Sequence, residues 1–367
     1  MVNKLPITLL SGFLGSGKTT LLNHLLTHAA GLKIGVIVND LSAVNVDSGL
    51  VVRTDQDLLE LSNGCICCTL RDELVAQVVR LARLGELDYL LIESTGVSEP
   101  LPVAQGFLLE PDGTPVLDVA RIDTLVTVVD ASTFLKDFAT LEKVDDRDPD
   151  APLEDRRNIV DLLVDQVEFA DVLVVNKSDL VGRGTRRAIE GRLRALNPSA
   201  ALVWTEHGRV DPSLVLATGR FDWDKSLTLP AWERELSKPH IPETVEYGIV
   251  NFSLVSDQPF HPQRLYKYFA TKRPELLRAK GWFTLATQPR VSWQFHLAGA
   301  KKKIEFAGKV APARGPRRAV EMVFIGVFGK KAERWKNELE KCLVRPGEVV
   351  DPAADPFARY LSQVGKR

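Results

Sequence analysis

The segment GFLGSGKT, residues 12–19, is the feature that most limits how this 367-residue chain can fold. It fits the pattern G-x-x-x-x-G-K-[ST] in full, follows the apolar run ITLL and opens the helical pattern TTLLNHLL. Glycines let a loop backbone wrap closely around a phosphate group, and the N–H groups at the start of a helix attract negative charge. The sequence therefore predicts a strand, a phosphate-binding loop (P-loop) and a helix, in that order.

The P-loop residues have separate predicted roles. Lys18 is expected to reach the β- and γ-phosphates of a nucleotide, which makes it a candidate catalytic residue, and the Thr19 hydroxyl is expected to bind Mg²⁺. Backbone N–H groups of the loop are expected to form an anion nest. The predicted phosphate-binding residues are Gly12, Gly15, Ser16, Gly17, Lys18, Thr19 and Thr20.

Strand-like runs alternate with helical patterns through the first half of the chain. Each predicted strand is short, rich in Val, Ile and Leu, and apolar on both faces, as buried parallel strands are. The predicted strands are residues 7–10, 34–38, 89–92, 124–129 and 172–175, and the predicted helices are 19–28, 71–83 and 159–169. This alternation predicts a P-loop NTPase domain with a mainly parallel, doubly wound α/β sheet.

The second half of the chain has a different pattern. Residues 221–242 mix Trp, Pro and charged residues, which predicts a linker between a nucleotide-binding domain at 1–220 and a second domain at 243–367. Strand-like and helical stretches in the second domain indicate a smaller α+β fold with a mostly antiparallel sheet. Core positions are expected for Cys342 and for the aromatic residues Trp282, Phe283, Trp293 and Phe295, and a client-binding surface is the alternative for the aromatic residues.

The sequence VVNKSDL, residues 174–180, leaves a predicted buried strand and contains N-K-x-D. The Asp179 carboxylate can accept hydrogen bonds from N1–H and N2–H₂ of guanine, a donor pair that adenine lacks. The Asn176 amide can meet the base edge, and the Lys177 stem can pack along the ring. We therefore expect GTP rather than ATP as the bound nucleotide.

Two further segments are candidates for contact with the γ-phosphate and its metal ion. In YLLIESTG, Glu93 ends an apolar strand, where an acidic residue normally supports magnesium, and the Gly96 N–H can approach the γ-phosphate. A helix cap is the alternative role for Glu93. In the polar loop 39–49, Asp40 and Asp47 are candidates for binding Mg²⁺ or orienting the attacking water, and ordinary turn aspartates are the alternative.

Three of the four cysteines, Cys65, Cys67 and Cys68, lie in the segment GCICC. Thiolates bind Zn²⁺ in tetrahedral sites at about 2.3 Å, and three ligands leave one position open. Structural zinc sites usually close with four protein ligands, so an open position suits a site that releases its metal. The alternatives are a redox pair of Cys65 with Cys68, or packing. His24 and His28, spaced i, i+4 on a predicted helix, are a weaker metal candidate.

The composition narrows the classes of partner. A net charge of −1 gives no overall attraction to nucleic acid or to an anionic membrane. No apolar stretch reaches the roughly 18 residues that span a bilayer, and the N-terminus lacks the pattern of a cleavable signal. We therefore expect a cytoplasmic protein with neither nucleic acid nor membrane as a partner. The basic runs 301–303 and 314–318 are expected to be solvated faces or loops.

Four segments, in this order, resemble the CobW-type GTPases: GFLGSGKTTLLNHLL, ELSNGCICCTLRDEL, LLIESTGVSEP and NKSDL. This family consists of GTP-dependent metallochaperones of the SIMIBI class of P-loop proteins. The segments YGIVNFSLVSDQPFHPQRL and RAKGWFTLAT resemble the C-terminal domain of the family, so the resemblance covers nearly the whole chain. The G-C-x-C-C element is its specific part, because P-loops are shared widely.

The resemblance implies that Cys65, Cys67 and Cys68 hold Zn²⁺ or a similar divalent ion and pass it to a client protein. It also implies that the remaining motifs bind GTP and Mg²⁺. This chain departs from the family pattern at Ala43, where the first switch usually carries glutamate, and it has no histidine-rich stretch. The segment NDLSAVN, residues 39–45, most resembles bacterial members of the family that are linked to zinc limitation.

The order of the motifs leads to a mechanistic hypothesis. The cysteine segment lies in the sequence between the first switch and Glu93. The hypothesis is that bound GTP orders the switch and brings the three thiolates together, and that GTP hydrolysis loosens this metal site. Slow intrinsic GTP hydrolysis is expected. The alternatives are a nucleotide- and zinc-sensing regulator of a protein or ribosomal partner, a P-loop kinase or ATPase, a metal store, or an activator that inserts cobalt or iron. The client and the oligomeric state stay open.

Overall fold

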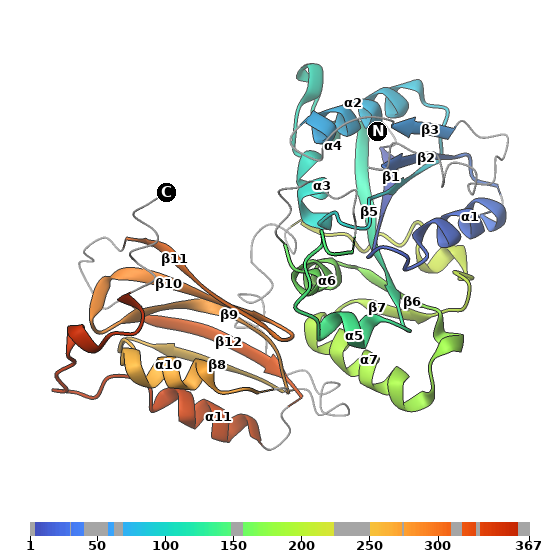
Figure 1. Cartoon of the computed structure of the whole chain (residues 1–367). Helices are drawn as coiled ribbons and strands as arrows, with labels where there is room; N and C mark the ends of the chain where they lie inside the picture. Colours follow the sequence, from blue (N-terminus) through green and yellow to red (C-terminus); the bar gives the residue numbers. More distant parts are fainter. Residues whose placement is uncertain are drawn as a thin grey trace. The chain divides into compact units, whose positions relative to one another are not determined.

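The computed structural model describes residues 4–29, 31–39, 58–61, 69–147, 157–223, 250–273, 275–309, 318–327 and 331–358 (Figure 1). The chain divides into two compact units. Most of the predicted linker lies outside the described residues, so the domain boundaries stay a prediction. In the described part of the chain, no helix is long and apolar enough to cross a membrane.

A seven-stranded sheet forms the centre of the first unit, in the order β3-β2-β4-β1-β5-β6-β7. All six neighbouring pairs are parallel. The strands are β1 Leu5–Ser11, β2 Ile34–Asn39, β3 Leu58–Leu61, β4 Tyr89–Glu93, β5 Ala120–Asp130, β6 Val172–Asn176 and β7 Ala201–Trp204. The prediction of a doubly wound, parallel α/β domain is confirmed.

Helices pack on both faces of this sheet because its strands are apolar on both sides. Ile7 of β1 packs in one core cluster with Val78, whereas Leu10 of the same strand packs in another with Leu21. The helices are α1 Lys18–His28, α2 Thr69–Leu84, α3 Pro100–Gly106, α4 Val116–Val119, α5 Phe134–Phe138, α6 Ile159–Glu168 and α7 Arg183–Leu196, with short 3₁₀ turns η1 Pro111–Gly113, η2 Ser178–Leu180 and η3 Pro212–Leu214.

The sheet order determines where the predicted site residues lie. Because the strands are parallel, their carboxyl ends meet at one edge of the sheet. Leu10 is in register with Glu93 across β1 and β4, and Asp130 with Asn176 across β5 and β6. The P-loop leaves the same edge after Ser11. Four motifs that are far apart in the sequence therefore begin side by side.

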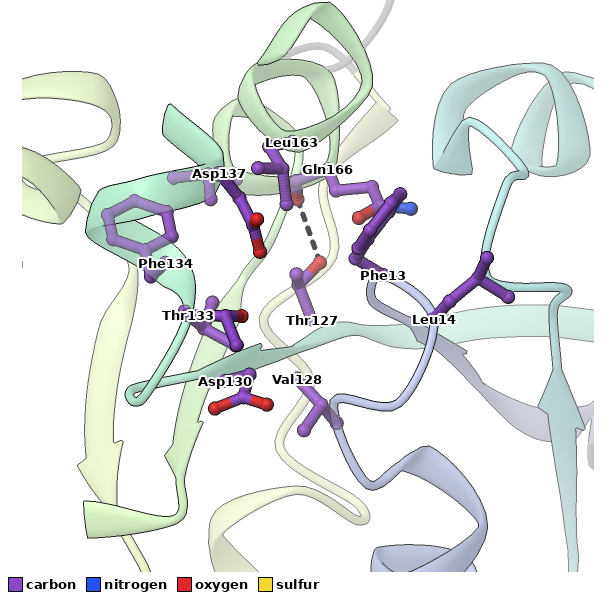
Figure 2. A pocket seen from close by; sticks show the side chains of 12 residues that line it. Phe13, Leu14, Thr127, Val128, Asp130, Thr133, Phe134, Asp137, Leu163 and Gln166 are labelled. Atoms are coloured by element: carbon purple, nitrogen blue, oxygen red, sulfur yellow. Dashed lines mark hydrogen bonds between the residues drawn. The ribbon is translucent and has the colours of Figure 1, made fainter. Parts of the chain in front are cut away.

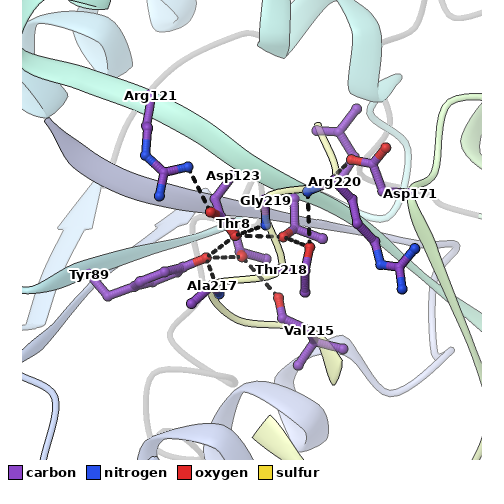
Figure 3. Close-up of polar contacts among 12 residues, drawn as sticks. Thr8, Tyr89, Arg121, Asp123, Asp171, Val215, Ala217, Thr218, Gly219 and Arg220 are labelled. Carbon is purple, nitrogen blue, oxygen red and sulfur yellow. Dashed lines mark hydrogen bonds and ion pairs between the residues drawn. The ribbon is translucent and has the colours of Figure 1, made fainter. Parts of the chain in front are cut away.

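A buried polar cluster fixes the segment that follows η3 against strands β1, β4 and β5 (Figure 3). The Asp123 carboxylate, 1% exposed, accepts hydrogen bonds from Tyr89 at 2.9 Å and Thr124 at 2.8 Å. The Ala217 N–H donates to the Tyr89 hydroxyl at 3.0 Å, and the Gly219 N–H donates to Asp123 at 3.3 Å. The segment 215–221 is thus tied to the sheet by buried side chains rather than by a strand.

An antiparallel sheet with the order β11-β10-β9-β12-β8 forms the second unit, and α10 and α11 cover one of its faces (Figure 1). The elements are β8 Val250–Ser256, α10 Pro262–Ala270, β9 Leu276–Leu285, β10 Gln288–Ala298, β11 Lys301–Lys309, β12 Val320–Gly326, α11 Lys331–Glu340 and η5 Pro352–Ala354. The prediction of an α+β domain is confirmed.

The core of the second unit contains most of the residues expected there. Phe283, Trp293 and Phe295 are at most 1% exposed, whereas Trp282 is only half-buried. Cys342 is 5% exposed, and burial raises the pKa of its thiol to about 11, so it is a protonated core residue at neutral pH. The basic run 301–303 belongs to strand β11 rather than to a loop.

The stretch after α11 completes this core. Phe357 is fully buried and contacts Phe283 and Trp293 with ring centroids 6.2 and 6.3 Å apart. Asp355 holds the stretch in place, because its carboxylate accepts hydrogen bonds from Thr287 at 2.5 Å and Gln288 at 2.8 Å. Thr287 lies in the turn between β9 and β10, and Gln288 is the first residue of β10, so the second unit extends at least to residue 357.

Candidate functional site

The P-loop backbone has the conformation that the glycine pattern predicts. Gly12, Gly15 and Gly17 have φ angles of +139°, +70° and +101°, which L-residues with side chains rarely adopt. A Cβ atom on Gly12 would lie 2.3 Å from the carbonyl oxygen of Val128. Gly17 then precedes the first residue of α1. The loop therefore presents the amino end of α1 toward the edge of the sheet, as a phosphate site requires.

The Lys18 side chain folds back over this loop. It is 8% exposed, and its Nζ donates a hydrogen bond to the Phe13 carbonyl at 3.4 Å. This distance is long for a charge-assisted hydrogen bond, which usually lies near 2.8 Å. The contact keeps the ammonium group at the loop, where phosphate oxygens can replace the carbonyl as its acceptor.

Thr19 and Glu93 meet at the centre of the site. The Thr19 hydroxyl donates to Glu93 Oε1 at 3.0 Å, and Glu93 is 5% exposed at the end of β4. Oxygen donors of this kind suit Mg²⁺, which is held by few protein ligands together with phosphates and waters. Two such oxygens beside the phosphate loop fit the predicted magnesium position. Glu93 caps no helix among those described, so the structure does not support the alternative role as a helix cap.

Asn176 joins the N-K-x-D segment, residues 176–179, to the P-loop; this segment is called the guanine motif because it is predicted to bind the base. Its Nδ2 donates to the Ser16 carbonyl at 3.0 Å, and its Oδ1 accepts from the Gly208 N–H at 2.9 Å. A Cβ atom on Gly17 would lie 2.3 Å from this Nδ2, so the third P-loop glycine makes room for the amide. Asn176 thus supports the loops, while its contact with the base edge stays a prediction.

Of the other two residues of the guanine motif, Lys177 forms an ion pair within the domain and Asp179 is exposed. Lys177 has φ +58° and its Nζ contacts Asp130 Oδ2 at 2.6 Å, so β5 and β6 are linked at their carboxyl ends. Asp179 is exposed, which leaves its carboxylate accessible to a base. Arg186 of α7 holds the turn that carries Asp179, because it donates to the carbonyls of Ser178 at 2.7 Å and Val181 at 3.3 Å.

Gly208 and Arg186 are supporting residues that the sequence did not reveal. Gly208 has φ +66°, and a Cβ there would lie 2.9 Å from the Leu21 N atom of α1. The turn TEHG after β7 was the available signal, but β7 has only four residues and was not predicted as a strand. Arg186 is one of several arginines in α7, a helix that was not predicted from the sequence.

The segment after Glu93 lies against the P-loop. A Cβ on Gly96 would come within 2.6 Å of Leu14 Cδ2 and 2.8 Å of the Leu14 N atom, so only glycine fits this approach. The hydroxyls of Thr95 and Ser98 are 2.5 Å apart and brace the turn internally. Gly96 therefore lies beside the loop predicted to hold phosphates, as expected for a residue that senses the γ-phosphate.

A small pocket adjoins the P-loop between β5, α5 and α6 (Figure 2). Phe13 and Leu14 form one wall, and Phe134 and Leu163 contribute further apolar surface. Inside it, the Thr127 hydroxyl donates to the Gln166 carbonyl at 2.7 Å. Gln166 of α6 and the P-loop residues Phe13 and Leu14 line the same pocket, although they are far apart in the sequence.

Several predicted site residues lie outside the described residues. These are Asp40, Ala43, Asp47, Cys65, Cys67 and Cys68. Of the residues that the structure does describe, no group of three or more His, Cys, Asp or Glu is arranged to hold a metal ion. His24 donates from Nε2 to the Val210 carbonyl at 2.8 Å and stacks on His28 at 4.1 Å, so this pair is explained by packing.

Two family models match the chain. The one described as "CobW/HypB/UreG, nucleotide-binding domain" matches residues 6–204, and the one described as "Cobalamin synthesis protein cobW C-terminal domain" matches residues 249–343. The first covers more than half of the chain and spans the P-loop, Glu93 and the guanine motif.

The chain belongs to the CobW family of P-loop GTPases. Among its relatives, the "Zinc-regulated GTPase metalloprotein activator 1" of Dictyostelium discoideum is 39% identical over 386 residues, covering 95% of this chain and 81% of the relative. The "Zinc chaperone CobW" of a Sinorhizobium species is 28% identical over 340 residues, covering 88% and 93%. CobW members with zinc-related names thus match along nearly the full chain.

Solved structures of CobW relatives also align with it. The crystal structure of Zn(II)-bound YjiA GTPase from Escherichia coli covers 93% of this chain and 99% of its own, with 21% identity and a TM-score of 0.43.

Proposed function

We propose that this CobW-family GTPase binds Zn²⁺, or a similar divalent ion, at Cys65, Cys67 and Cys68 and delivers it to a client protein. GTP tightens the metal site, and hydrolysis to GDP and phosphate loosens it. The observation that carries the proposal is where the cysteine segment is attached. The chain leaves the sheet at Leu61 and returns to described structure at Thr69, the first residue of α2.

The last described residue before the cysteine segment lies at the edge of the sheet that carries the P-loop and Glu93. β3 is parallel to β2, and β2 is parallel to β4, so Leu61 ends at the same edge as Glu93. Neighbouring strands lie about 4.8 Å apart, so two strand spacings separate these ends by about 10 Å. A change in the nucleotide loops near Glu93 therefore arises within about two strand spacings of Leu61, after which the cysteine segment follows in the sequence.

The nucleotide part of the proposal uses residues that the structure brings together. The P-loop amides and Lys18 hold the phosphates, and Asp179 recognises guanine. Thr19 and Glu93 would hold Mg²⁺, which when bound neutralises charge that develops on the β- and γ-phosphates. Gly96, in contact with the P-loop, responds to the γ-phosphate. Asp47 remains a candidate for orienting the attacking water.

The metal part follows from the number and type of ligands. Three thiolates select soft or borderline ions such as Zn²⁺ over Mg²⁺. The fourth position can be filled by a ligand of the client, which gives the ion a route from one protein to the other. Relatives named zinc chaperone and zinc-regulated activator support Zn²⁺, while the name of the second family model keeps cobalt as a competing ion.

The test is a zinc titration against a competing chelator in three states: nucleotide-free, with GDP, and with a non-hydrolysable GTP analogue. Zinc affinity should rise at least about fivefold with the analogue, a typical coupling between two sites. Cys68→Ser should abolish tight binding, whereas Cys342→Ala, at a buried cysteine outside the motif, should leave it unchanged. Equal zinc affinity in all three states contradicts the proposal, and a parallel Co²⁺ titration decides between the ions.

A further inference from the structure

We propose that Arg157 and Gln166 are positioning residues that hold the loop 94–99 in place and thereby set how strongly the protein prefers GTP to GDP. The inference rests on the proposed function in one respect, because it takes Gly96 as the residue that responds to the γ-phosphate. Neither side chain belongs to a nucleotide-binding motif of the sequence.

Gln166 holds the loop from inside the domain. It is 1% exposed on α6, and its Nε2 donates to the carbonyls of Ser98 at 3.2 Å and Gly96 at 3.4 Å. Both partners are acceptors, so only the amide nitrogen can face them. The backbone carbonyl of the same residue accepts from Thr127 of β5. Gln166 is therefore fixed to the central sheet and binds the loop from that fixed position.

Arg157 holds the same loop from the surface. Its Nη2 donates to the Val97 carbonyl at 2.8 Å, and its Nη1 pairs with Glu99 Oε1 at 2.8 Å. The two side chains of this ion pair are about one third exposed, so the contact is partly accessible to solvent. Together with Gln166, Arg157 engages three successive carbonyls, those of residues 96, 97 and 98.

The held loop lies directly against the phosphate loop. Gly96 approaches Leu14 so closely that a Cβ atom would clash with the Leu14 backbone. A loop already held in this position loses less conformational freedom when a γ-phosphate binds. GDP has no γ-phosphate and gains nothing from this preorganisation. Loss of Arg157 or Gln166 should therefore weaken GTP binding and leave GDP binding nearly unchanged.

Arg157 also connects the loop to a turn on the surface. Its carbonyl accepts from the Val144 N–H at 3.0 Å, and the neighbouring Ile159 N–H donates to the Glu142 carbonyl at 3.1 Å. An isolated antiparallel bridge joins Lys143 to Asn158. The turn around residues 142–147 is thus attached to Arg157, which holds the loop 94–99. A change in this loop on GTP binding can therefore alter the turn at the surface.

The experiment compares Arg157→Gln, Arg157→Lys and Gln166→Met with the wild-type protein and with Arg147→Gln. Arg147 pairs with Asp137 and Glu142 in the same region, and neither partner belongs to the loop 94–99, so it is the matched control. Affinities for GDP and for a non-hydrolysable GTP analogue are measured in Mg²⁺ without zinc, together with kcat, KM and the midpoint of thermal unfolding.

We expect the ratio of analogue affinity to GDP affinity to fall at least about fivefold in Arg157→Gln and Gln166→Met, a typical coupling between two sites. GDP affinity should stay within about twofold of the wild-type value. Arg157→Lys should have an intermediate ratio, because lysine keeps the charge that pairs with Glu99 but loses the fork that also reaches Val97. The ratio of Arg147→Gln should match the wild-type ratio.

Unchanged ratios in the folded variants overturn this inference and leave the zinc titration as a separate test of the proposed function. A parallel loss of GDP and analogue affinity also overturns it, because that result indicates a purely structural role. If Arg157→Gln does not fold, Arg157→Lys and Gln166→Met decide the outcome. A zinc affinity that ignores the nucleotide while the ratios fall would refute the proposed metal coupling and support the roles of Arg157 and Gln166.

Discussion

The side-chain amide of Asn176 donates a hydrogen bond to the Ser16 carbonyl at 3.0 Å, although the two residues are 160 positions apart in the sequence. The Oδ1 atom of the same amide accepts from the Gly208 N–H. One buried side chain therefore determines how the phosphate loop, the guanine motif and the turn after β7 fit together. Nucleotide binding and domain stability should depend on each other at this point.

Replacement of Asn176 by alanine should reduce both stability and GTP affinity. The change leaves the Ser16 carbonyl and the Gly208 N–H without their partner, and a buried unsatisfied group costs about 1–3 kcal/mol. Urea unfolding of the nucleotide-free protein should show a loss of about 2–4 kcal/mol, allowing for partial relaxation. An unchanged unfolding free energy would mean that Asn176 does not hold the loops together.

Asp179→Asn should change nucleotide specificity without changing stability, because Asp179 is exposed. Hydrogen bonds to a charged group contribute about 1.5–3 kcal/mol, so GTP affinity should fall roughly 10- to 100-fold. An asparagine can donate to the extra carbonyl of xanthine, so affinity for xanthosine triphosphate should rise. Isothermal titration with GTP, XTP and ATP checks this, and retained GTP affinity would remove Asp179 from the guanine site.

Arg186→Gln should weaken GTP and GDP binding to the same extent. Arg186 holds the turn with Asp179 through two backbone carbonyls and lies over the Trp204 ring at 5.8 Å. Its loss lets the turn move but touches nothing near the γ-phosphate, so a fall of about three- to tenfold is expected for both nucleotides. Arg187→Gln, at the exposed neighbour, is the control. A selective loss of GTP affinity would contradict this role.

The buried Asp123 should make the first unit sensitive to acid. Burial opposes ionisation of this carboxyl, but hydrogen bonds from Thr124, Arg121 and Tyr89 outweigh burial and hold its pKa below the ordinary value of 3.8. A lowered folded-state pKa stabilises the protein above the unfolded-state pKa, and this contribution is lost as the pH falls through the folded-state pKa.

Asp123→Asn should therefore destabilise the protein by about 1–3 kcal/mol at neutral pH. The difference from the wild-type protein should stay constant above about pH 5 and shrink below about pH 4, where the carboxyl is protonated first in the unfolded protein and, at lower pH, in the folded protein. Urea unfolding followed across this range measures the difference. A difference that grows on acidification would have the wrong sign for this carboxylate.

Phe357→Ala should destabilise the second unit, although residue 357 lies beyond the range 249–343 that matches the C-terminal family model. Removal of a fully buried phenylalanine typically costs about 3–5 kcal/mol. Val349→Ala, at a side chain that is 94% exposed, is the control and should have no effect. Tryptophan fluorescence during unfolding reports on this unit through Trp293, which Phe357 contacts.

Much of the fold followed from the sequence because its signals are local. The glycine pattern, short apolar runs and alternating helical patterns predicted β1, β2, β4, β5 and β6 and the residues at their ends. The strands β3 and β7 have four residues each, too few for a pattern to distinguish them from loops. In the second unit, the strand-like runs 245–254, 291–295 and 319–328 predict β8, β10 and β12, whereas Lys, Arg and Gly interrupt the apolar pattern of β9 and β11.

The supporting residues were harder to predict for a different reason. Gln166 and Arg186 act through backbone carbonyls that lie between 5 and 70 positions away, and Gly208 acts through the side chain of Asn176, 32 positions away. No spacing rule connects these three residues to the P-loop. Arg157 ends the polar stretch 143–157, whose composition predicts only an exposed loop or insertion. Motifs identify groups that touch a ligand, whereas the groups that hold those motifs in place become visible only when the chain is folded.

The most direct measurement of the central claim follows zinc and phosphate release in the same single-turnover reaction. The zinc-loaded GTP complex is mixed with a chromogenic zinc chelator and a phosphate sensor. We expect zinc to appear at the rate of phosphate release and to stay bound, on that timescale, when a non-hydrolysable analogue replaces GTP. Zinc that leaves equally fast with GTP and with the analogue would contradict control of the metal site by GTP hydrolysis.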